Sequence, residues 1–264
     1  MSLTKWGLIA GGGLLWVWIG GAGAAAGIVS PGCLSGGEAA QLADVDEALD
    51  LHLRDGRVVH LPGVAAAPGR VTDARTLLRG WLLRTPMLVR VLRSEPDRWG
   101  RTPALAFAEA GGSSPGLVSV SEALLEAGLV LARPDADIDP CWADYLSLED
   151  EARRTGRGLW ATRHMIDPQD ATALQANAGA LAIVEGRLAR VHAGRARLYL
   201  RFSGDGGTGF AAALALPLVR RMTKGGQDPS GWVGRNLAVR GLLDDRWGWQ
   251  IDVTSLQQLR LDPP

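Results

Sequence analysis

Residues 48–61 read ALDLHLRDGRVVHL, and this stretch sets the expected fold of the first half of the chain. Apolar and polar residues alternate on both sides of Asp55-Gly56, which is typical of two antiparallel strands joined by a tight hairpin turn. Apolar residues at helical spacing follow over 73–84, and strands are predicted at about 87–93 and 104–110. We expect Ser121 to cap a helix that runs to Ala127, and a second, charged helix over about 142–156.

The pattern changes after residue 168. Residues 169–180 show no core periodicity and are interpreted as a linker. Short alternating segments return at 184–191, 198–202, 209–216, 237–243 and 250–254, separated by Gly-rich turns and accompanied by one helix. Five short strands of this kind predict a small closed barrel. Trp247-Gly248-Trp249 is interpreted as a strand and turn with partial core burial, and residues 204–209 as a hairpin turn.

The N-terminus predicts export. Lys5 precedes an uncharged stretch at 6–29 that ends in Ala24-x-Ala26, a pattern typical of a cleaved secretory signal. About 20 apolar residues also suffice to span a bilayer, so a retained anchor remains an alternative. Lipid attachment at Cys33 is a third and weaker one. In an oxidising compartment Cys33 and Cys141 are predicted to form a disulfide.

Composition limits the kinds of partner. The 264 residues carry 28 basic and 28 acidic side chains, which excludes a generally basic nucleic-acid binder. Two Cys and four His do not supply a structural zinc site, and no cofactor or metal is predicted. Residues 34–179 hold 15 Arg against 21 Asp or Glu, whereas residues 180–264 hold 12 basic and 7 acidic side chains. We therefore expect the halves to dock on each other, or the second half to present basic residues to an anionic protein or to lipid headgroups. The candidate binding residues are Arg187, Arg190, Arg195, Arg197 and Arg201.

Four motifs resemble one known family. Residues 97–104, DRWGRTPA, resemble the D-x-Y-G-R-x-L-A signature of staphylococcal nuclease-like domains, and residues 121–130, SEALLEAGLV, resemble that family's N-x-x-L-V-x-x-G-L-A helix. Residues 149–153 with 158–160 resemble its E-x-x-A-R…G-L-W ending, and residues 59–64 resemble V-R-L-x-G-I. The match covers about residues 40–161 in the family's order. Residues 198–202, 239–241 and 251–254 resemble more loosely the OB-like extension of some exported bacterial relatives.

The resemblance implies a mainly β fold with helices (α+β), containing two OB-type five-stranded barrels after an N-terminal signal or anchor helix. The first barrel would be a nuclease-like domain with packed helices. The expected domains are a signal or anchor at 1–29, the nuclease-like domain at 34–168, the linker at 169–180 and the OB-like barrel at 181–262.

The family's chemistry makes demands that this chain does not meet. Such nucleases use a calcium ion held by carboxylates, a Glu as general base and two Arg that clamp the phosphate. The calcium-holding acids correspond here to Ala48 and Ala65, the base to Pro68 or Gly69, and the first clamp to His60. The second clamp, Arg101, is retained.

Substitution of the missing acids from nearby is not expected. Asp46 or Asp50 would need a register shift, and adjacent strand residues point to opposite faces. His60 is interpreted as an ordinary strand residue, and Arg101 as a surface ion-pair partner. Glu149, Glu151, Arg153 and Arg154 are interpreted as a solvated helix face.

Three functions remain open. The favoured one is an exported, catalytically inactive nuclease-like scaffold that binds a protein, an accessory subunit of an integral membrane assembly at the outer face of the cytoplasmic membrane. The alternatives are an exported nuclease with a rearranged site at His60 and Arg101, and an oligonucleotide- or oligosaccharide-binding module. Nucleic acid is not the favoured partner. Two or more carboxylates within metal-binding reach of the Arg101 guanidinium would favour the nuclease, and their absence the scaffold.

Overall fold

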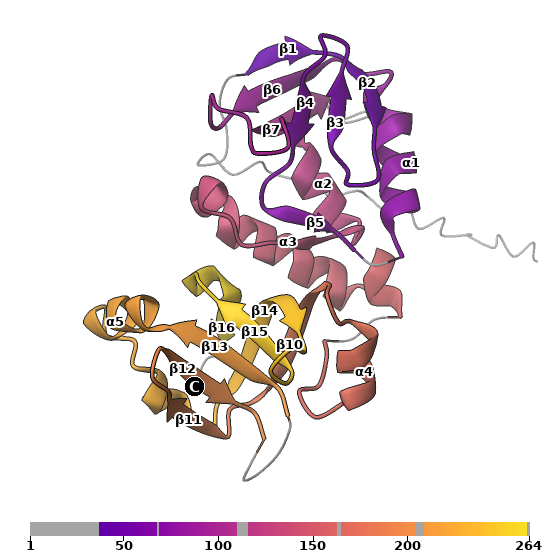
Figure 1. Ribbon diagram of the computed structural model, residues 1–264. Coiled ribbons are helices and arrows are strands. Elements are labelled where there is room, and N and C mark those ends of the chain that lie inside the picture. The colour runs from indigo at the N-terminus through magenta and orange to yellow at the C-terminus, as the bar shows by residue number, and fades with distance from the viewer. Residues whose placement is uncertain (1–36, 68, 110–115, 163–164, 204–208, 263–264) are drawn as a thin grey trace, which may run out of the picture.

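The computed structural model describes residues 37–67, 69–109, 116–162, 165–203 and 209–262 (Figure 1). These residues form a mixed α+β fold of sixteen strands and five α-helices, as the sequence predicts at the level of fold class. The helices are α1 (Val71–Leu82), α2 (Val120–Glu126), α3 (Trp142–Arg154), α4 (Ala171–Ala176) and α5 (Leu216–Lys224).

The first half contains one curled sheet with the strand order β1-β6-β7-β4-β3-β2, and β8 pairs with β7. Its strands are β1 (Glu38–Ala40), β2 (Leu42–Val45), β3 (Leu51–Leu53), β4 (Val58–His60), β6 (Met87–Val91), β7 (Thr102–Glu109) and β8 (Leu117–Ser119). The hairpin at Asp55-Gly56 forms as predicted: β3 and β4 pair antiparallel, and Gly56 has a φ of 91° that a turn of this kind requires. β5 (Val64–Ala66) and β9 (Val130–Ala132) pair separately.

The second half contains a sheet with the order β10-β14-β15-β13-β12-β11, and β16 pairs with β14. Its strands are β10 (Leu181–Arg187), β11 (Arg190–Ala193), β12 (Arg197–Arg201), β13 (Ala211–Ala215), β14 (Asn236–Asp244), β15 (Gln250–Val253) and β16 (Leu259–Leu261). When β5, which pairs with β9 instead, is left out of the count, the two sheets share one strand order along these paths. Each also has a parallel pair at the same place, β4 with β7 and β13 with β15.

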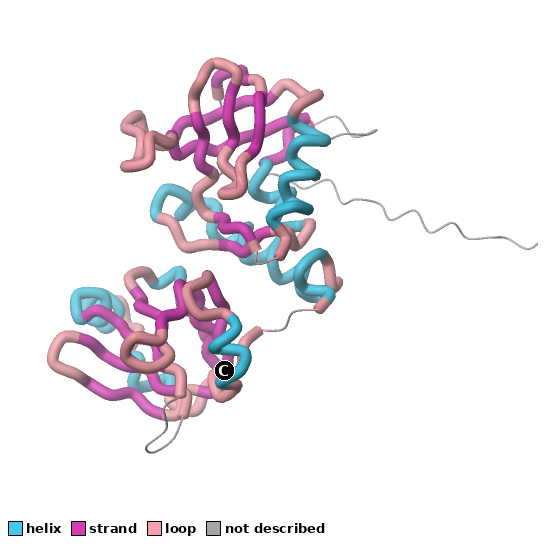
Figure 2. Tube along the Cα trace, turned by 45° about the vertical axis from the view of Figure 1, so that its right-hand side comes forward, coloured by secondary structure: helices cyan, strands magenta, loops and turns pink. Residues whose placement is uncertain are grey.

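Each half has its own hydrophobic core, and a third cluster joins them. Leu51, Leu78 and Val89 belong to the first core, and Phe210, Leu214 and Val239 to the second. The third cluster brings Trp160 and Leu131 of the first half against Ile183 and Ala238 of the second. Helix α3 lies between the two sheets (Figures 1 and 2), so the halves pack directly on each other through this layer.

Two local expectations were wrong. Helix α2 is capped by Ser119, whose Oγ accepts a hydrogen bond from the Glu122 N–H, whereas Ser121 is buried inside the helix. Residues 169–180 contain α4, and Leu174 of this helix is buried with Ile166 in the second core. One apolar side chain per short helix is too weak a period to read from sequence.

The predictions for the N-terminus lie outside the described residues. Neither the signal or anchor at 1–29 nor Cys33 is described, so export and the disulfide stay predictions. No helix in the described ranges is long and apolar enough to cross a membrane. Cys141 is buried directly before α3.

Candidate functional site

A cluster of paired charges surrounds Arg101 at the start of β7. Its Nη1 donates to Asp50 Oδ2 at 3.0 Å, and its Nε and Nη2 donate to Asp97 Oδ2 at 2.9 and 2.7 Å. The other oxygen of Asp50 lies 2.8 Å from His60 Nδ1. The structure therefore brings together His60 and Arg101, the two sequence candidates, and joins them through a carboxylate that is 3% exposed.

The backbone between β2 and β3 explains how Asp50 reaches this cluster. Residues 46–49 form a turn rather than a strand, and Leu49 has a φ of 65°, unusual for a residue other than Gly. Asp46 Oδ1 accepts hydrogen bonds from the N–H groups of Ala48 and Asp50 and holds the turn. The expectation that the Asp50 carboxylate would be aimed away was wrong, because the β3–β4 register, with Leu51 opposite Val59, sets Asp50 opposite His60 when continued by one pair.

The loop from Asp97 to Arg101 is organised by the second carboxylate. Asp97 Oδ1 accepts the N–H groups of Trp99 and Arg101, while its Oδ2 accepts the guanidinium. Trp99 is 62% exposed. The guanidinium carbons of Arg98 and Arg101 lie 3.9 and 4.7 Å from the centroid of its ring. Asp97 and Trp99 stand in the family-like motif, so the sequence pointed to the loop without showing its pairing.

Electrostatics keep both carboxylates ionised. Burial raises the pKa of Asp50, but hydrogen bonds from His60 and Arg101 outweigh it, and the pKa lies below its ordinary value. The hydrogen bond from Arg101 lowers the pKa of Asp97 to about 2. The cluster is thus an internally hydrogen-bonded network, and all three nitrogens of the Arg101 guanidinium donate to carboxylates.

The positions of the family's catalytic groups do not fit calcium. Ala48 is exposed in the turn, Ala65 lies on β5 opposite Leu131, and Gly69 has a φ of 74° after β5. Pro68 lies outside the described residues. Alanine and glycine side chains supply no oxygen ligand, and the described part of the chain holds no group of three or more His, Cys, Asp or Glu arranged for a metal ion.

The halves are locked together by a buried ion pair. Arg240 on β14 donates through Nη2 to Glu149 Oε2 at 2.6 Å and through Nη1 to the Ala132 carbonyl at 2.7 Å. Glu149 Oε1 also accepts the Ala132 N–H at 2.8 Å, and Arg260 pairs with Asp150 at 2.6 Å.

Glu149 is therefore not part of a solvated face, in contrast to Glu151 and Arg154, which pair with each other on the exposed side of α3. Cations of the second half meet acids of the first, as the regional charges suggest.

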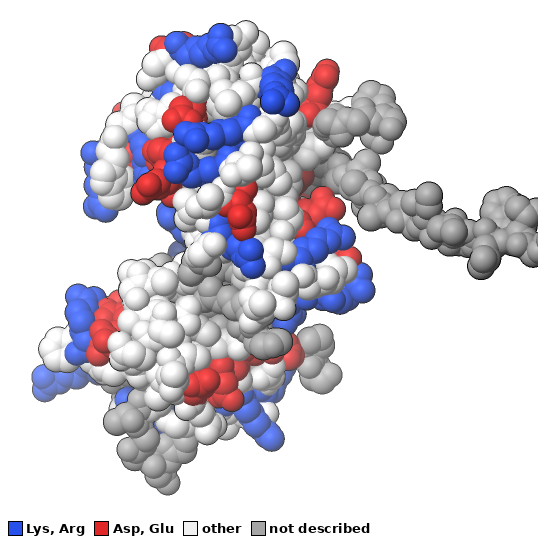
Figure 3. All heavy atoms as spheres, turned by 90° about the vertical axis from the view of Figure 1, so that its right-hand side faces the viewer, with Lys and Arg blue, Asp and Glu red and all other residues white. Residues whose placement is uncertain are grey.

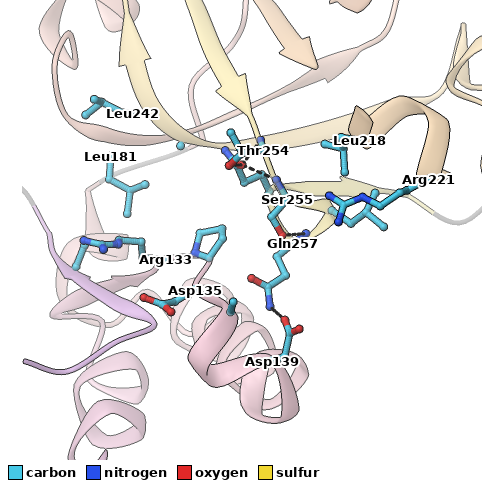
Figure 4. Close-up of a pocket in the computed structure, with 16 residues that line it drawn as sticks. Arg133, Asp135, Asp139, Leu181, Leu218, Arg221, Leu242, Thr254, Ser255 and Gln257 are labelled. Carbon is cyan, nitrogen blue, oxygen red and sulfur yellow. Dashed lines mark hydrogen bonds between the residues drawn. The ribbon is translucent and has the colours of Figure 1, made fainter. Parts of the chain in front are cut away.

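A cleft of about 940 Å³ lies between the halves (Figure 4). Arg133, Asp135 and Asp139 line it from the first half, and Arg221 of α5 with residues 254–258 from the second. Gln257 Nε2 donates to Asp139 across the cleft. Ala65 is also in its wall. The cleft combines both signs of charge with leucine side chains, and its polar groups partly pair with one another.

The basic candidates of the second half divide into two groups. Arg190 and Arg201 are opposite each other in the β11–β12 pair, Arg197 lies on β12, and Arg195 is in the connecting turn. Arg187 ends β10 and lies beside Gly234, so it does not join that hairpin. Over the first half, by contrast, cationic and anionic side chains are interspersed on the face shown in Figure 3, which leaves no single-sign area there.

The sequence missed one residue of the second half. Trp249 is half-buried against the second core, as expected, but Trp247 is 86% exposed. It borders a pocket of about 310 Å³ together with Arg197, Tyr199, Arg246, Gln250 and Asp252. The signal in the sequence was Gly248, which stands between the two Trp residues. It has a φ of 89°, and Trp247 on one side of it is exposed whereas Trp249 on the other side is half-buried.

Comparison with known proteins adds no assignment: no protein-family model matches the chain, and no curated protein sequence matches it significantly.

Proposed function

We propose that the chain is an exported, catalytically inactive nuclease-like scaffold that binds another protein at the outer face of the cytoplasmic membrane. The observation that carries the proposal is the pairing of Arg101. A phosphate clamp must offer its donors to the substrate, but here Nε, Nη1 and Nη2 all donate to Asp50 and Asp97.

The strand order supports the fold part of the proposal. In each half a three-strand meander is followed by a helix and two further strands, and the third and fifth strands run parallel. This connectivity supports an OB-type five-stranded barrel in each half. Two such barrels, with the nuclease-like one first, agree with the resemblance to exported relatives.

The pairing of the halves supports a scaffold. The buried Arg240–Glu149 pair and the third hydrophobic cluster fix the barrels as one unit. A rigid pair of barrels presents a surface of constant shape, which lowers the entropic cost of binding a partner.

An active nuclease keeps one observation in its favour. Two carboxylates, Asp50 and Asp97, do lie within metal-binding reach of Arg101. However, both carboxylates contact the guanidinium itself, so the cation that lies between them is Arg101. Their other oxygens are already occupied: Asp50 contacts His60, and Asp97 accepts backbone N–H groups.

Two assays on the full chain test the proposal. We expect no cleavage of single-stranded DNA or RNA at millimolar calcium, and calcium-dependent turnover that disappears in Arg101→Ala would establish the nuclease instead. For the location, cells are fractionated and the N-terminus is sequenced. A mature chain that begins near Gly27, is fully soluble at low salt and is in no complex would contradict the membrane-bound scaffold.

A further inference from the structure

A pocket in the first half is lined by acids from two helices. Helices α2 and α3 pack on each other (Figure 1), and a pocket of about 170 Å³ lies between them, with Val118 of β8 also in its wall. Residues one turn apart on a helix share a face, so α2 supplies Glu122 and Glu126, and α3 supplies Asp144 and Leu148. The wall therefore contains three carboxylates and, among the described residues, no basic side chain.

Glu122 is the most buried of these three acids, and it has an unpaired oxygen. The residue is 6% exposed, whereas Glu126 and Asp144 are half-buried. Its Oε1 makes no hydrogen bond in the described structure. Burial, followed by the charge of Asp144, raises the pKa of Glu122 to about 7. A buried carboxylate without a partner is costly, and a cation beside it would offset that cost.

The other two acids differ in what they already bind. Glu126 Oε1 accepts a hydrogen bond from Arg157 Nη1 at 3.2 Å, so its charge is partly neutralised. Asp144 lies in the first turn of α3 and forms no ion pair within the described ranges. Two carboxylates, Glu122 and Asp144, are thus available to one cation that enters between the helices.

The lining favours an organic cation over a metal ion. The described residues hold no group of three or more His, Cys, Asp or Glu arranged for a metal. Val118, Ala123 and Leu148 offer apolar surface to a hydrocarbon stem, and the Ser147 hydroxyl offers a further acceptor. A guanidinium has five donors in one plane and is less strongly hydrated than an ammonium, so it suits several acceptors at a partly desolvated site.

We propose that this pocket receives an arginine side chain of the protein partner, and that its guanidinium pairs with Glu122 and Asp144. The inference rests on the proposed scaffold function and specifies the chemistry of one contact with the partner. Residues 34–179 carry 15 Arg against 21 Asp or Glu, and this excess of acids attracts a basic surface. Arginines seated in desolvated pockets are frequent among the residues that dominate binding energy at protein interfaces.

The test uses the full chain in mild detergent at moderate salt, with the blocked amino acid N-acetyl-arginine N-methylamide as the probe. We expect saturable NMR shift changes at the amides of α2 and of the first turns of α3. Glu122→Gln and Asp144→Asn should each weaken binding about tenfold or more, because a hydrogen bond between charged groups is lost. Glu151→Gln, on the exposed side of α3, is the matched control and should leave the affinity unchanged. N-acetyl-norleucine N-methylamide, which has a hydrocarbon stem without the charge, should not bind.

Several outcomes would overturn the inference. Absence of binding by the arginine probe, or equal affinity in wild type, Glu122→Gln and Asp144→Asn, would remove the site. Equal binding of the norleucine probe would reduce the site to an apolar pocket, and tighter binding of the matching lysine probe would overturn the choice of arginine.

Fractionation of cells separates a failure of the pocket from a failure of the scaffold. A membrane complex recovered at full yield with Glu122→Gln would refute the pocket as the docking point and leave the scaffold standing. A chain found in no complex, with binding of the arginine probe intact, would refute the scaffold and leave the cation pocket standing.

Discussion

Arg240 and Glu149, 91 residues apart in the sequence, form a bidentate ion pair in which both side chains are almost fully buried, at 7% and 3% exposure. Arg240 also lies over the ring of Trp142 at 5.4 Å and bonds the Ala132 carbonyl. A buried pair of this kind contributes less through its mutual attraction than through the cost of leaving one member unpaired.

Arg240→Met is accordingly expected to lower the free energy of unfolding by about 3 to 5 kcal/mol, because the Glu149 charge stays buried without its partner. Urea unfolding of the full chain measures this loss. Glu149→Gln should cost clearly less in the Arg240→Met background than in the wild type, since no charge is then left unpaired. Arg154→Met on the exposed face of the same helix is the control, with an expected change below about 1 kcal/mol. Equal losses of unfolding free energy in Arg240→Met and Arg154→Met would show that the buried pair between the two halves contributes no more to stability than an exposed pair.

The ion-pair cluster in the first half leads to a second prediction, about stability rather than catalysis. Arg101→Gln deprives the buried Asp50 of a charged donor and should cost about 1 to 3 kcal/mol. Arg57→Gln, in an exposed pair with Asp55, should be close to neutral. If Arg101→Gln leaves the unfolding midpoint unchanged, the guanidinium is not committed to Asp50 and Asp97 in solution.

Acid unfolding gives an independent view of this cluster. The pKa of Asp97 is depressed from 3.8 to about 2, so its stabilising contribution is present above pH 3.8 and is lost as the pH falls toward 2. Asp50 contributes with the same sign. Arg101→Gln should therefore flatten the pH dependence of unfolding in this range relative to wild type.

The hairpin, helix α1 and the strands of the second half follow from patterns that are local in sequence. The Asp55-Gly56 turn and the alternation on either side predicted β3 and β4, and helical spacing predicted α1. The pairing of Asp50 with Arg101 could not be obtained in that way, because the two residues are 51 positions apart in the sequence and meet only in the folded sheet.

The role of Glu149 was equally hidden from sequence reading. Four charged residues within one helical turn or two are typical of a solvated surface, and only the packing of β14 against α3 distinguishes Glu149 from Glu151. Trp247 and Trp249 show the same limit, since a single glycine turn sends one ring into the core and the other into solvent.

Glu122 supplies a third prediction, with the opposite pH dependence from Asp97. Burial, followed by the neighbouring Asp144 charge, raises the pKa of Glu122 to about 7, and its Oε1 has no hydrogen-bond partner in the described structure. The folded chain then holds a proton that the unfolded chain releases near pH 4.5, so stability is full below pH 4.5 and declines as the pH rises to 7.

Between these values the free energy of unfolding should fall by about 3 kcal/mol, given roughly 1.4 kcal/mol per pH unit. Glu122→Gln keeps the shape of the protonated acid and should remove this decline, which makes the variant more stable than wild type at pH 8. Urea titrations at pH 5, 6, 7 and 8 provide the measurement. Glu126→Gln, more exposed on the same helix and paired with Arg157, is the control. Parallel pH profiles for wild type and Glu122→Gln would mean that the carboxyl ionises normally in the folded chain.

The fourth prediction concerns Cys141. The 3-10 turn at 136–141 places this side chain in the first core, just before α3. Pairing with Cys33 would tie the segment that enters β1 to the start of α3 and would close a loop of more than about 100 residues. In the chain-entropy model such a link restricts the unfolded state by about 4 to 5 kcal/mol.

We expect reducing agent to lower the unfolding midpoint, and mass analysis of a non-reduced digest to recover a Cys33–Cys141 peptide pair. The Cα atoms should then lie about 4.4 to 6.8 Å apart in an experimental structure. Two alkylatable thiols in protein recovered from the export compartment would contradict the pairing, and with it one argument for an oxidising location.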